Sequence, residues 1–522
     1  MKKKGKTSWV YTPKKINVWR GIGFGMNDLM GGGWNNIVSG VIFVFVMSNG
    51  ISPALAGAIT GIGRIFDAIF SLFFGAITDG FYRNKLGQKF GRRHFFILIG
   101  GILFAIVFPL FWVKSTNWIY YLVVYVAIEL IIAMILIPWE TLPTEMTTDY
   151  NLRTVLSGSR MVISATGTAL VFFILAALKH AKNPNAYLVT GIIWTIIFVI
   201  AIFVSYRSTW ERPLTEDFVK KLDSKPDLPL GTFLKNTIQD YFSTFKNKSF
   251  RQHLAIYLLS FTGKDFYSIM LPTFILCCIN GAKDDLPWTL QALSAVGILA
   301  TLAATQLMIK RGPRFLYGLS YSTIILTMIG YILTWIFDVN NPVVILIAIS
   351  LVYQCGRAIL EFTPWNVFPF IPDIDRIMTR QDRAGIYAAV MTFFRKSTGA
   401  VASWIAGILL EVIGFNSKTM LNYNTTPRNI QLGIMLIFFI GPVILVGWAL
   451  IIAMKFKLNR QTHDILKAEL ERLQNGGSKA DVKPETKKVV EELTGEPYSD
   501  VWPDIDEDKQ TSLKNADLKG GN

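Results

Sequence analysis

The chain carries little charge for its length. Only 17% of its 522 residues are Asp, Glu, Lys or Arg, and 52% are hydrophobic; soluble domains have about 25% charged residues. This balance excludes a soluble globular protein and indicates one that crosses a membrane many times. The net charge of +16 suggests nucleic acid at first sight. However, the basic residues lie between the hydrophobic runs, where membrane topology requires them, so no nucleic-acid partner is expected.

Cysteine and histidine are scarce as well. The three cysteines, Cys277, Cys278 and Cys355, lie inside hydrophobic runs and have neither a disulfide-framework spacing nor a zinc spacing. The four histidines are scattered, so we expect no metal site and no cofactor. The N-terminal segment lacks the hydrophobic core of a cleaved signal peptide. No convincing nucleophile–base pair or metal set is present, so an enzyme is not expected.

Long hydrophobic runs make up most of the remainder. A spanning helix needs about 20 mostly hydrophobic residues. That measure predicts twelve spans, near residues 22–47, 53–80, 94–113, 118–138, 155–179, 187–206, 254–279, 287–309, 315–337, 342–366, 384–412 and 430–455. The predicted fold class is therefore an all-α polytopic membrane protein.

The spacing of these runs predicts two six-helix halves, residues 21–206 and 252–455, joined by a cytoplasmic central loop at 207–251. Residues 1–20 form a short cytoplasmic tail. Residues 456–522 are predicted to form a largely disordered cytoplasmic tail, with one amphipathic helix at 462–473 and disorder beyond Asn475.

The basic residues predict the orientation. If the N-terminus is cytoplasmic, the cytoplasmic segments before the tail hold 28 Lys and Arg residues, and the external loops hold six. Positive charge concentrates on the cytoplasmic side of membrane proteins. We therefore expect a multi-pass plasma-membrane protein with both termini inside.

Several spans contain charges, which are expensive in lipid and usually mark a polar pathway. Function is the favoured interpretation for Asp28, Asp67 and Arg160, which lie deep in hydrophobic runs. Structural ion pairing is the favoured interpretation for a second group: Glu129, Arg357, Glu361 and Glu411.

Two groups of these charged residues suggest particular chemistry. A sugar is commonly held by a carboxylate and an arginine, with an aromatic face against the ring; Asp28, Arg160 and one of the tryptophans Trp34, Trp139 or Trp365 could supply this. Asp67 is the candidate for reversible protonation, with Arg64 or Lys396 as its cationic partner. Sodium needs several oxygen ligands, and near Asp67 only Ser71 offers another.

Short motifs follow one another in a characteristic order: Gly23 to Asp28, Gly63 to Asp67, Gly75 to Asp79, Gly91 to Arg93, Ile137 to Pro143, Ser159–Arg160 and Phe394 to Gly399. In this order the sequence resembles the glycoside-pentoside-hexuronide:cation symporter family, the melibiose permease-like branch of the major facilitator superfamily. The resemblance covers about residues 20–455 and implies a twelve-helix fold that works by alternating access.

The resemblance also implies roles for particular residues. The resemblance places Asp28 and Arg160 on the substrate, Asp67 and Lys396 in the cation-coupling site, and Asp79, Arg92 and Arg93 in a cytoplasmic gate. The predicted substrate site also includes Asn27, Trp139 and Glu140, with Glu140 either a replacement carboxylate or a loop charge, and the predicted coupling site also includes Arg64 and Ser71. No metal ligands are implied.

Three positions depart from the family pattern. Ser71 stands where sodium-using members have a second Asp, Leu136 stands where an acidic residue is expected, and Glu140 replaces an aromatic residue. The expected sodium site is therefore incomplete, so H⁺ is favoured as the coupling ion and Na⁺ is the alternative.

We accordingly predict a secondary active transporter that imports a sugar or glycoside by cation symport and works as a monomer in the lipid bilayer. Two alternatives remain: a lysolipid or amphiphile carrier of the same fold, and a membrane nutrient sensor that signals through its C-terminal tail.

Overall fold

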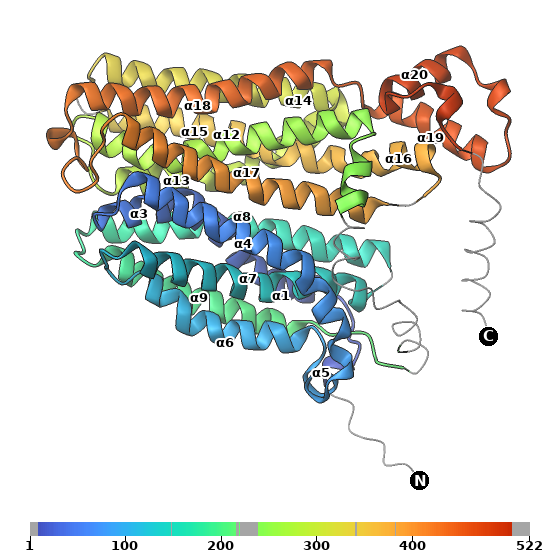
Figure 1. The fold of residues 1–522 in the computed structure, drawn as a ribbon, viewed down its shortest axis with the longest axis horizontal. Helices are drawn as coiled ribbons and strands as arrows, with labels where there is room; N and C mark the ends of the chain where they lie inside the picture. The colour runs from blue at the N-terminus through green and yellow to red at the C-terminus, as the bar shows by residue number, and fades with distance from the viewer. Residues whose placement is uncertain are drawn as a thin grey trace, which may run out of the picture.

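The computed structural model describes residues 9–147, 149–215, 219, 238–339, 342–381 and 383–503, without the side chains at positions 72, 73, 76, 79, 150, 151 and 154. Long helices dominate this part of the chain, and they run along the long axis of the molecule (Figure 1).

The first half begins with a broken span, made of α1 (Val18–Gly25), α2 (Asn27–Ile37), η2 (Val38–Ile42) and α3 (Phe43–Ser48). Then follow α4 (Pro53–Gly80), η3 (Phe81–Arg83), α5 (Lys85–Phe90), α6 (His94–Phe111), α7 (Trp118–Met146), α8 (Tyr150–His180) and α9 (Ala186–Ser208). The start of α4 is encoded locally. The Ser52 side chain accepts a hydrogen bond from the Leu55 N–H, and Pro53 occupies the first helical turn.

The second half contains α12 (Lys248–Cys278), α13 (Leu286–Ala292), η4 (Leu293–Val296), α14 (Gly297–Ile336), α15 (Val343–Val367), η5 (Phe368–Phe370), α16 (Ile371–Thr379), α17 (Ala384–Val412) and α18 (Arg428–Lys455). The backbone of Gly312 has φ 75° and interrupts α14. Pro313 follows directly, so the run from α13 to Ile336 contains two successive spans.

A helix therefore lies at each of the twelve predicted positions. Among the described residues, nine helical runs are long and hydrophobic enough to cross a membrane. The two successive spans that are joined at Gly312 are counted as one of these nine runs. The other two helices, α12 and α17, fall outside that group because of their internal charges, Lys264 with Asp265 and Arg395 with Lys396.

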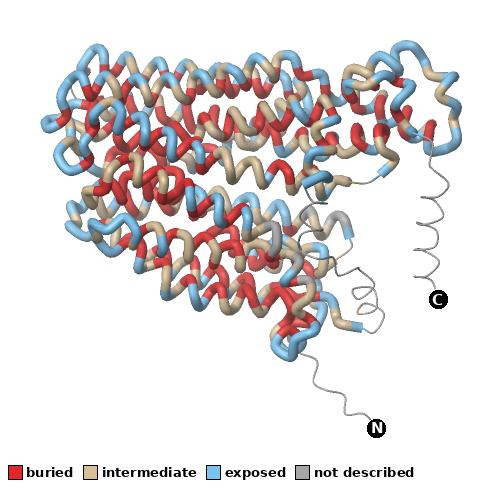
Figure 2. The backbone as a smooth tube through the Cα atoms, in the orientation of Figure 1, coloured by how far each residue is buried: buried red, intermediate tan, exposed pale blue. Residues whose placement is uncertain are grey.

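The two halves lie side by side, and α4 of the first packs along α17 of the second (Figure 1). Glycine permits the close approach. A Cβ on Gly407 would lie 2.2 Å from the Pro53 carbonyl oxygen, and one on Gly57 would lie 2.4 Å from the Ser403 carbonyl oxygen. Both contacts are at the end opposite the chain termini, where buried residues continue from one half into the other (Figure 2).

The C-terminal tail is more ordered than predicted. The expected amphipathic helix is present as α19 (Arg460–Gln474), with Leu466, Leu470 and Leu473 buried. The predicted disorder beyond Asn475 is wrong for residues 475–503, which form η7 (Lys479–Asp481), α20 (Pro484–Thr494) and η8 (Tyr498–Asp500). The remaining predicted disorder, at 504–522, lies outside the described residues.

Tertiary contacts explain the order of this segment. Val490 and Leu493 of α20 are buried, the Ser249 hydroxyl donates to the Leu493 carbonyl at 2.6 Å, and the Trp502 N–H donates to the Ile377 carbonyl at 2.8 Å. A short charged helix is marginal alone, but packing of its hydrophobic face stabilises it.

Candidate functional site

The predicted substrate residues come together between α2, α7 and α8. The glycines of α2 allow this approach: a Cβ on Gly31 would lie 2.4 Å from Asp28 Oδ1, and one on Gly32 would lie 2.4 Å from Ser164 Oγ of α8. The glycine run therefore serves helix packing.

Arg160 is the centre of this cluster. Its Nε donates to Asp28 Oδ2 at 3.0 Å and its Nη2 donates to Glu140 Oε1 at 2.8 Å, although the three residues come from three helices. The side chains of Arg160 and Glu140 are 35% and 48% exposed, whereas Asp28 is 10% exposed. The cluster thus offers a guanidinium and two carboxylates, with free N–H and oxygen positions that can bind hydroxyl groups.

The other two predicted substrate residues lie differently. The Trp139 ring is 0% exposed. It stacks on Phe24, its Nε1 donates to the Phe24 carbonyl at 3.0 Å, and the Arg160 guanidinium lies 4.8 Å from the ring centre. Trp139 therefore positions Arg160 and does not offer a face to a sugar in this conformation. The Asn27 side chain is also fully buried, so it does not face a ligand here.

The predicted coupling residues form a second cluster, which joins the two halves. Lys396 Nζ of α17 lies 2.7 Å from Asp67 Oδ2 of α4. Ser71 bridges the pair, because its hydroxyl donates to Asp67 Oδ1 at 3.2 Å and accepts from Lys396 Nζ at 3.0 Å. Ser71 and Lys396 are 325 residues apart in the sequence, yet together with Asp67 they form one hydrogen-bonded unit.

Arg64 lies near this unit but turns toward different partners. Its strongest electrostatic neighbours are Tyr125, Glu129 and Asp265. Gly399 makes room for it: a Cβ there would lie 2.6 Å from Arg64 Nη1 and 3.3 Å from Asp265 Oδ2. Arg64 therefore stands between carboxylates of the first and second halves.

A third group of charges lines the second half. Asp265 pairs with Arg395 at 2.7 Å, and Glu361 pairs with Lys264 at 3.0 Å and with Arg357 at 3.1 Å. The expected pairing of Arg357 with Glu361 along one helix is confirmed. Sequence reasoning missed the contact of Arg357 Nη2 with Asn36 Oδ1 of the first half, at 2.8 Å; an isolated asparagine gives no signal of a partner 321 residues away.

The predicted gate residues lie at the end of the molecule that carries the termini. Arg92 and Arg93 both pair with Glu145 at the end of α7, at 2.7 and 3.4 Å. The side chain of Asp79, the third predicted gate residue, lies outside the described residues. Glu145 was not predicted, although it lies two residues after the Ile137 to Pro143 motif.

Glu211, which follows α9, was missed as well. Its carboxylate accepts hydrogen bonds from the backbone N–H groups of Arg92, Arg93 and His94 and lies 2.9 Å from His94 Nδ1. Burial raises the pKa of this carboxyl, but the His94 side chain and the N–H donors outweigh that effect and hold the pKa below its usual value. Glu211 therefore anchors the start of α6 to the end of α9.

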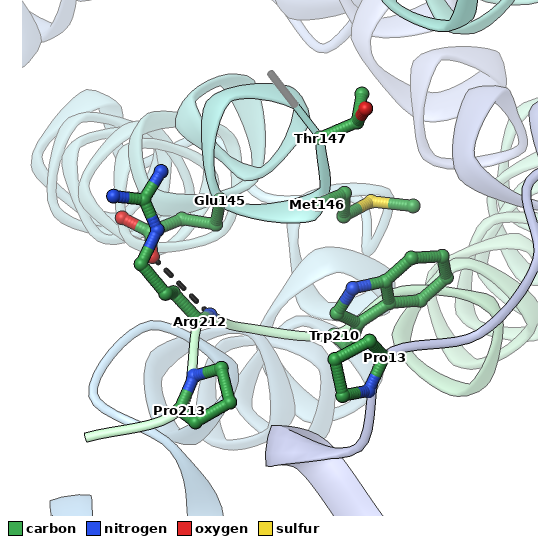
Figure 3. A pocket seen from close by; sticks show the side chains of 7 residues that line it. All are labelled: Pro13, Glu145, Met146, Thr147, Trp210, Arg212 and Pro213. Atoms are coloured by element: carbon green, nitrogen blue, oxygen red, sulfur yellow. Dashed lines mark hydrogen bonds between the residues drawn. The ribbon is translucent and has the colours of Figure 1, made fainter. Parts of the chain in front are cut away.

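A hollow of about 400 Å³ lies beside this anchor, lined by Pro13, Glu145, Met146, Thr147, Trp210, Arg212 and Pro213 (Figure 3). The Arg212 N–H donates to Glu145 Oε2 across it at 3.3 Å. The hollow contains none of the predicted substrate or coupling residues.

Two helical halves joined by buried charges are an arrangement that fits a membrane transporter. The chain belongs to the MFS/sugar transport protein family, whose sequence model matches residues 23–460. The predicted resemblance is thus confirmed.

Individual relatives agree with this assignment. The chain is 22% identical over 473 residues to an uncharacterized symporter of Synechocystis sp. (74% of this chain, 83% of the relative). It is also 22% identical over 459 residues to the glucuronide carrier protein homolog of Escherichia coli (81% and 91%) and over 342 residues to the isoprimeverose transporter of Lactiplantibacillus pentosus (60% and 67%).

Solved structures share the fold. A nucleoside transporter NupG variant has a TM-score of 0.58 at 14% identity (84% of this chain, 100% of that chain). A bacterial homolog of the lysosomal transporter Spinster, in an inward-facing and unoccupied conformation, has a TM-score of 0.55 at 12% identity (85% and 98%).

Proposed function

We propose that this protein imports a sugar or glycoside across the plasma membrane by proton symport and alternating access. The observation that carries the proposal is the presence of two charged clusters: that of Asp28, Arg160 and Glu140 within the first half, and that of Asp67, Ser71 and Lys396, which joins the two halves. One offers hydrogen-bond groups to a polyol, and the other ties the two halves together through charge.

The substrate class follows from the first cluster. Sugar hydroxyl groups both donate and accept, and a guanidinium flanked by two carboxylates supplies the complement of each. The relatives named as a glucuronide carrier homolog and an isoprimeverose transporter support a carbohydrate substrate.

The coupling ion follows from the second cluster. Sodium requires several oxygen ligands, whereas Asp67 is already bound to the Lys396 ammonium, and the further group that supports it among the described residues is the Ser71 hydroxyl. A carboxylate paired with an ammonium suits a proton or charge switch better than a sodium shell. The distribution of basic residues assigns both termini to the cytoplasm. The end of the molecule opposite the termini is then the external side, and it is closed in the observed conformation. There the Ser417 hydroxyl donates to the Ile51 carbonyl at 2.8 Å.

The decisive experiment is uptake into proteoliposomes with a panel of radiolabelled glycosides, under a pH gradient, a sodium gradient, or neither. We expect accumulation driven by the pH gradient, loss of that accumulation in Asp67→Asn, and loss of binding in both Asp28→Ala and Arg160→Ala. Accumulation driven by sodium alone would refute proton coupling. Normal binding in both substrate-site variants would refute the site.

A further inference from the structure

We propose that Glu129 on α7 is the carboxyl that carries the coupling proton in this conformation, while Asp67 serves as the ionised partner of Lys396. The inference rests on the proposed proton symport and adds a second coupling residue to it. The sequence alone favoured a structural role for Glu129, and the structure gives three reasons to revise that interpretation.

The first reason is the environment of Glu129. Its side chain is 4% exposed. It accepts a hydrogen bond from the Tyr125 hydroxyl and another from Trp34 Nε1 at 3.3 Å. Both donors are neutral, and within the described part of the chain Glu129 makes no ion pair.

The second reason is the contrast with Asp67. Asp67 has an ammonium at 2.7 Å and a hydroxyl donor at 3.2 Å, so its negative charge is compensated directly. A buried carboxylate without a cation in contact carries a large desolvation penalty. Binding a proton removes that penalty at Glu129, whereas at Asp67 it would break an existing ion pair.

The third reason is the set of charges around the two carboxylates. Helix α4 supplies Arg64 and Asp67, and α17 supplies Lys396; their charges all act on Glu129. On α6, the only titratable residue is His94, which is held by Glu211 at the far end of the helix. On α8, Arg160 is already engaged by Asp28 and Glu140. Two carboxylates thus face two cations, and one bound proton leaves this group with one net positive charge.

This change in charge links the protonation of Glu129 to the relative position of the two halves. Arg64 stands between Glu129 of the first half and Asp265 of the second half. When Glu129 is protonated, the attraction of Arg64 to Asp265 is no longer opposed by Glu129, and this attraction draws the two halves together. When Glu129 releases its proton to the cytoplasm, it attracts Arg64 again and weakens the attraction between Arg64 and Asp265. Protonation therefore favours the conformation seen here.

Infrared difference spectroscopy on the full-length protein in liposomes tests this assignment without a substrate. Acidification should produce the C=O stretching band of a protonated carboxylic acid, which is absent in Glu129→Gln, shifted in Tyr125→Phe and retained in Asp67→Asn. Glu129→Asp should restore a band. A band that survives in Glu129→Gln but disappears in Asp67→Asn would overturn the proposal, as would the absence of any such band in the unmodified protein.

Transport separates this inference from the proposed function. Glu129→Gln should lose pH-driven accumulation by about tenfold or more while substrate counterflow, which needs no net proton movement, stays within about twofold. Coupled accumulation at the normal level in Glu129→Gln would refute the role of Glu129. If the unmodified protein transports no glycoside, the proposed function fails, and the infrared result still decides whether Glu129 holds a proton.

Discussion

The ion pair of Asp67 and Lys396 should set the balance between the two conformations of the transporter. It joins α4 to α17 at 2.7 Å, and its side chains are 10% and 29% exposed. Removing one partner of a fully buried pair costs about 3–5 kcal/mol. Because Lys396 is almost a third exposed, we expect about 2 kcal/mol here. The conformational equilibrium should then shift about 30-fold away from the state seen here.

A double-mutant cycle with distance measurements would test this magnitude. Spin labels at Leu86→Cys and Gln381→Cys, both exposed and on different halves, would report the separation of the halves at the end that carries the termini. The three native cysteines would first be replaced. Asp67→Asn and Lys396→Met should each populate the state with that end closed, and the double variant should shift little further, because the second change removes a partner that is already lost.

The matched control is Glu411→Gln, which changes another carboxylate of the α4–α17 interface; Glu411 accepts a hydrogen bond from the Ala54 N–H at 3.1 Å and has no ion pair among the described residues. It should shift the distances less than either change in the pair. Additive shifts from Asp67→Asn and Lys396→Met would refute the reasoning, because they would show that the two charges act independently of each other.

Three further predictions concern single residues. Arg160→Lys should weaken glycoside binding about tenfold or more, because a lysine ammonium lacks the planar set of N–H donors with which the guanidinium binds both Asp28 and Glu140. An unchanged binding affinity, measured by calorimetry, would contradict this. Gly407→Val should destabilise the observed conformation by about 1–3 kcal/mol through a clash with Pro53. The same spin labels would detect this change as a loss of the larger label-to-label distance, which belongs to the conformation with the end at the termini open. Glu211→Gln should lower the thermal midpoint at neutral pH. Since the pKa of Glu211 is depressed, its contribution is complete above the ordinary carboxyl range and is lost as the pH falls through the lowered pKa, so the two proteins should converge in acid.

The positions of the helices could be predicted from the sequence because each span is encoded locally. About 20 hydrophobic residues are needed in each span, and signals such as Ser52–Pro53 mark the start of a helix. The candidate residues Asp28, Asp67 and Arg160 could also be found, because a charge within a hydrophobic run is costly wherever its partner lies.

The partners themselves were decided by tertiary packing. Nothing near Arg357 indicates Asn36, and nothing near Glu129 indicates its donor Trp34, because these contacts depend on how separate helices are packed. Trp139 lies in a motif, yet only the structure shows that Phe24 and Arg160 occupy its ring. The order of α20 likewise depends on α12 and α16, since a short charged helix gains its stability from docking.

The sequence by itself therefore determined a helical, multi-span transporter and the charges that must face its interior, because the bilayer imposes those constraints on each segment separately. The tertiary structure decided which carboxylate is tied to a cation and which is not. That distinction depends on distances of a few ångströms between helices, and it separates Asp67, paired with Lys396, from Glu129, which is held by neutral donors.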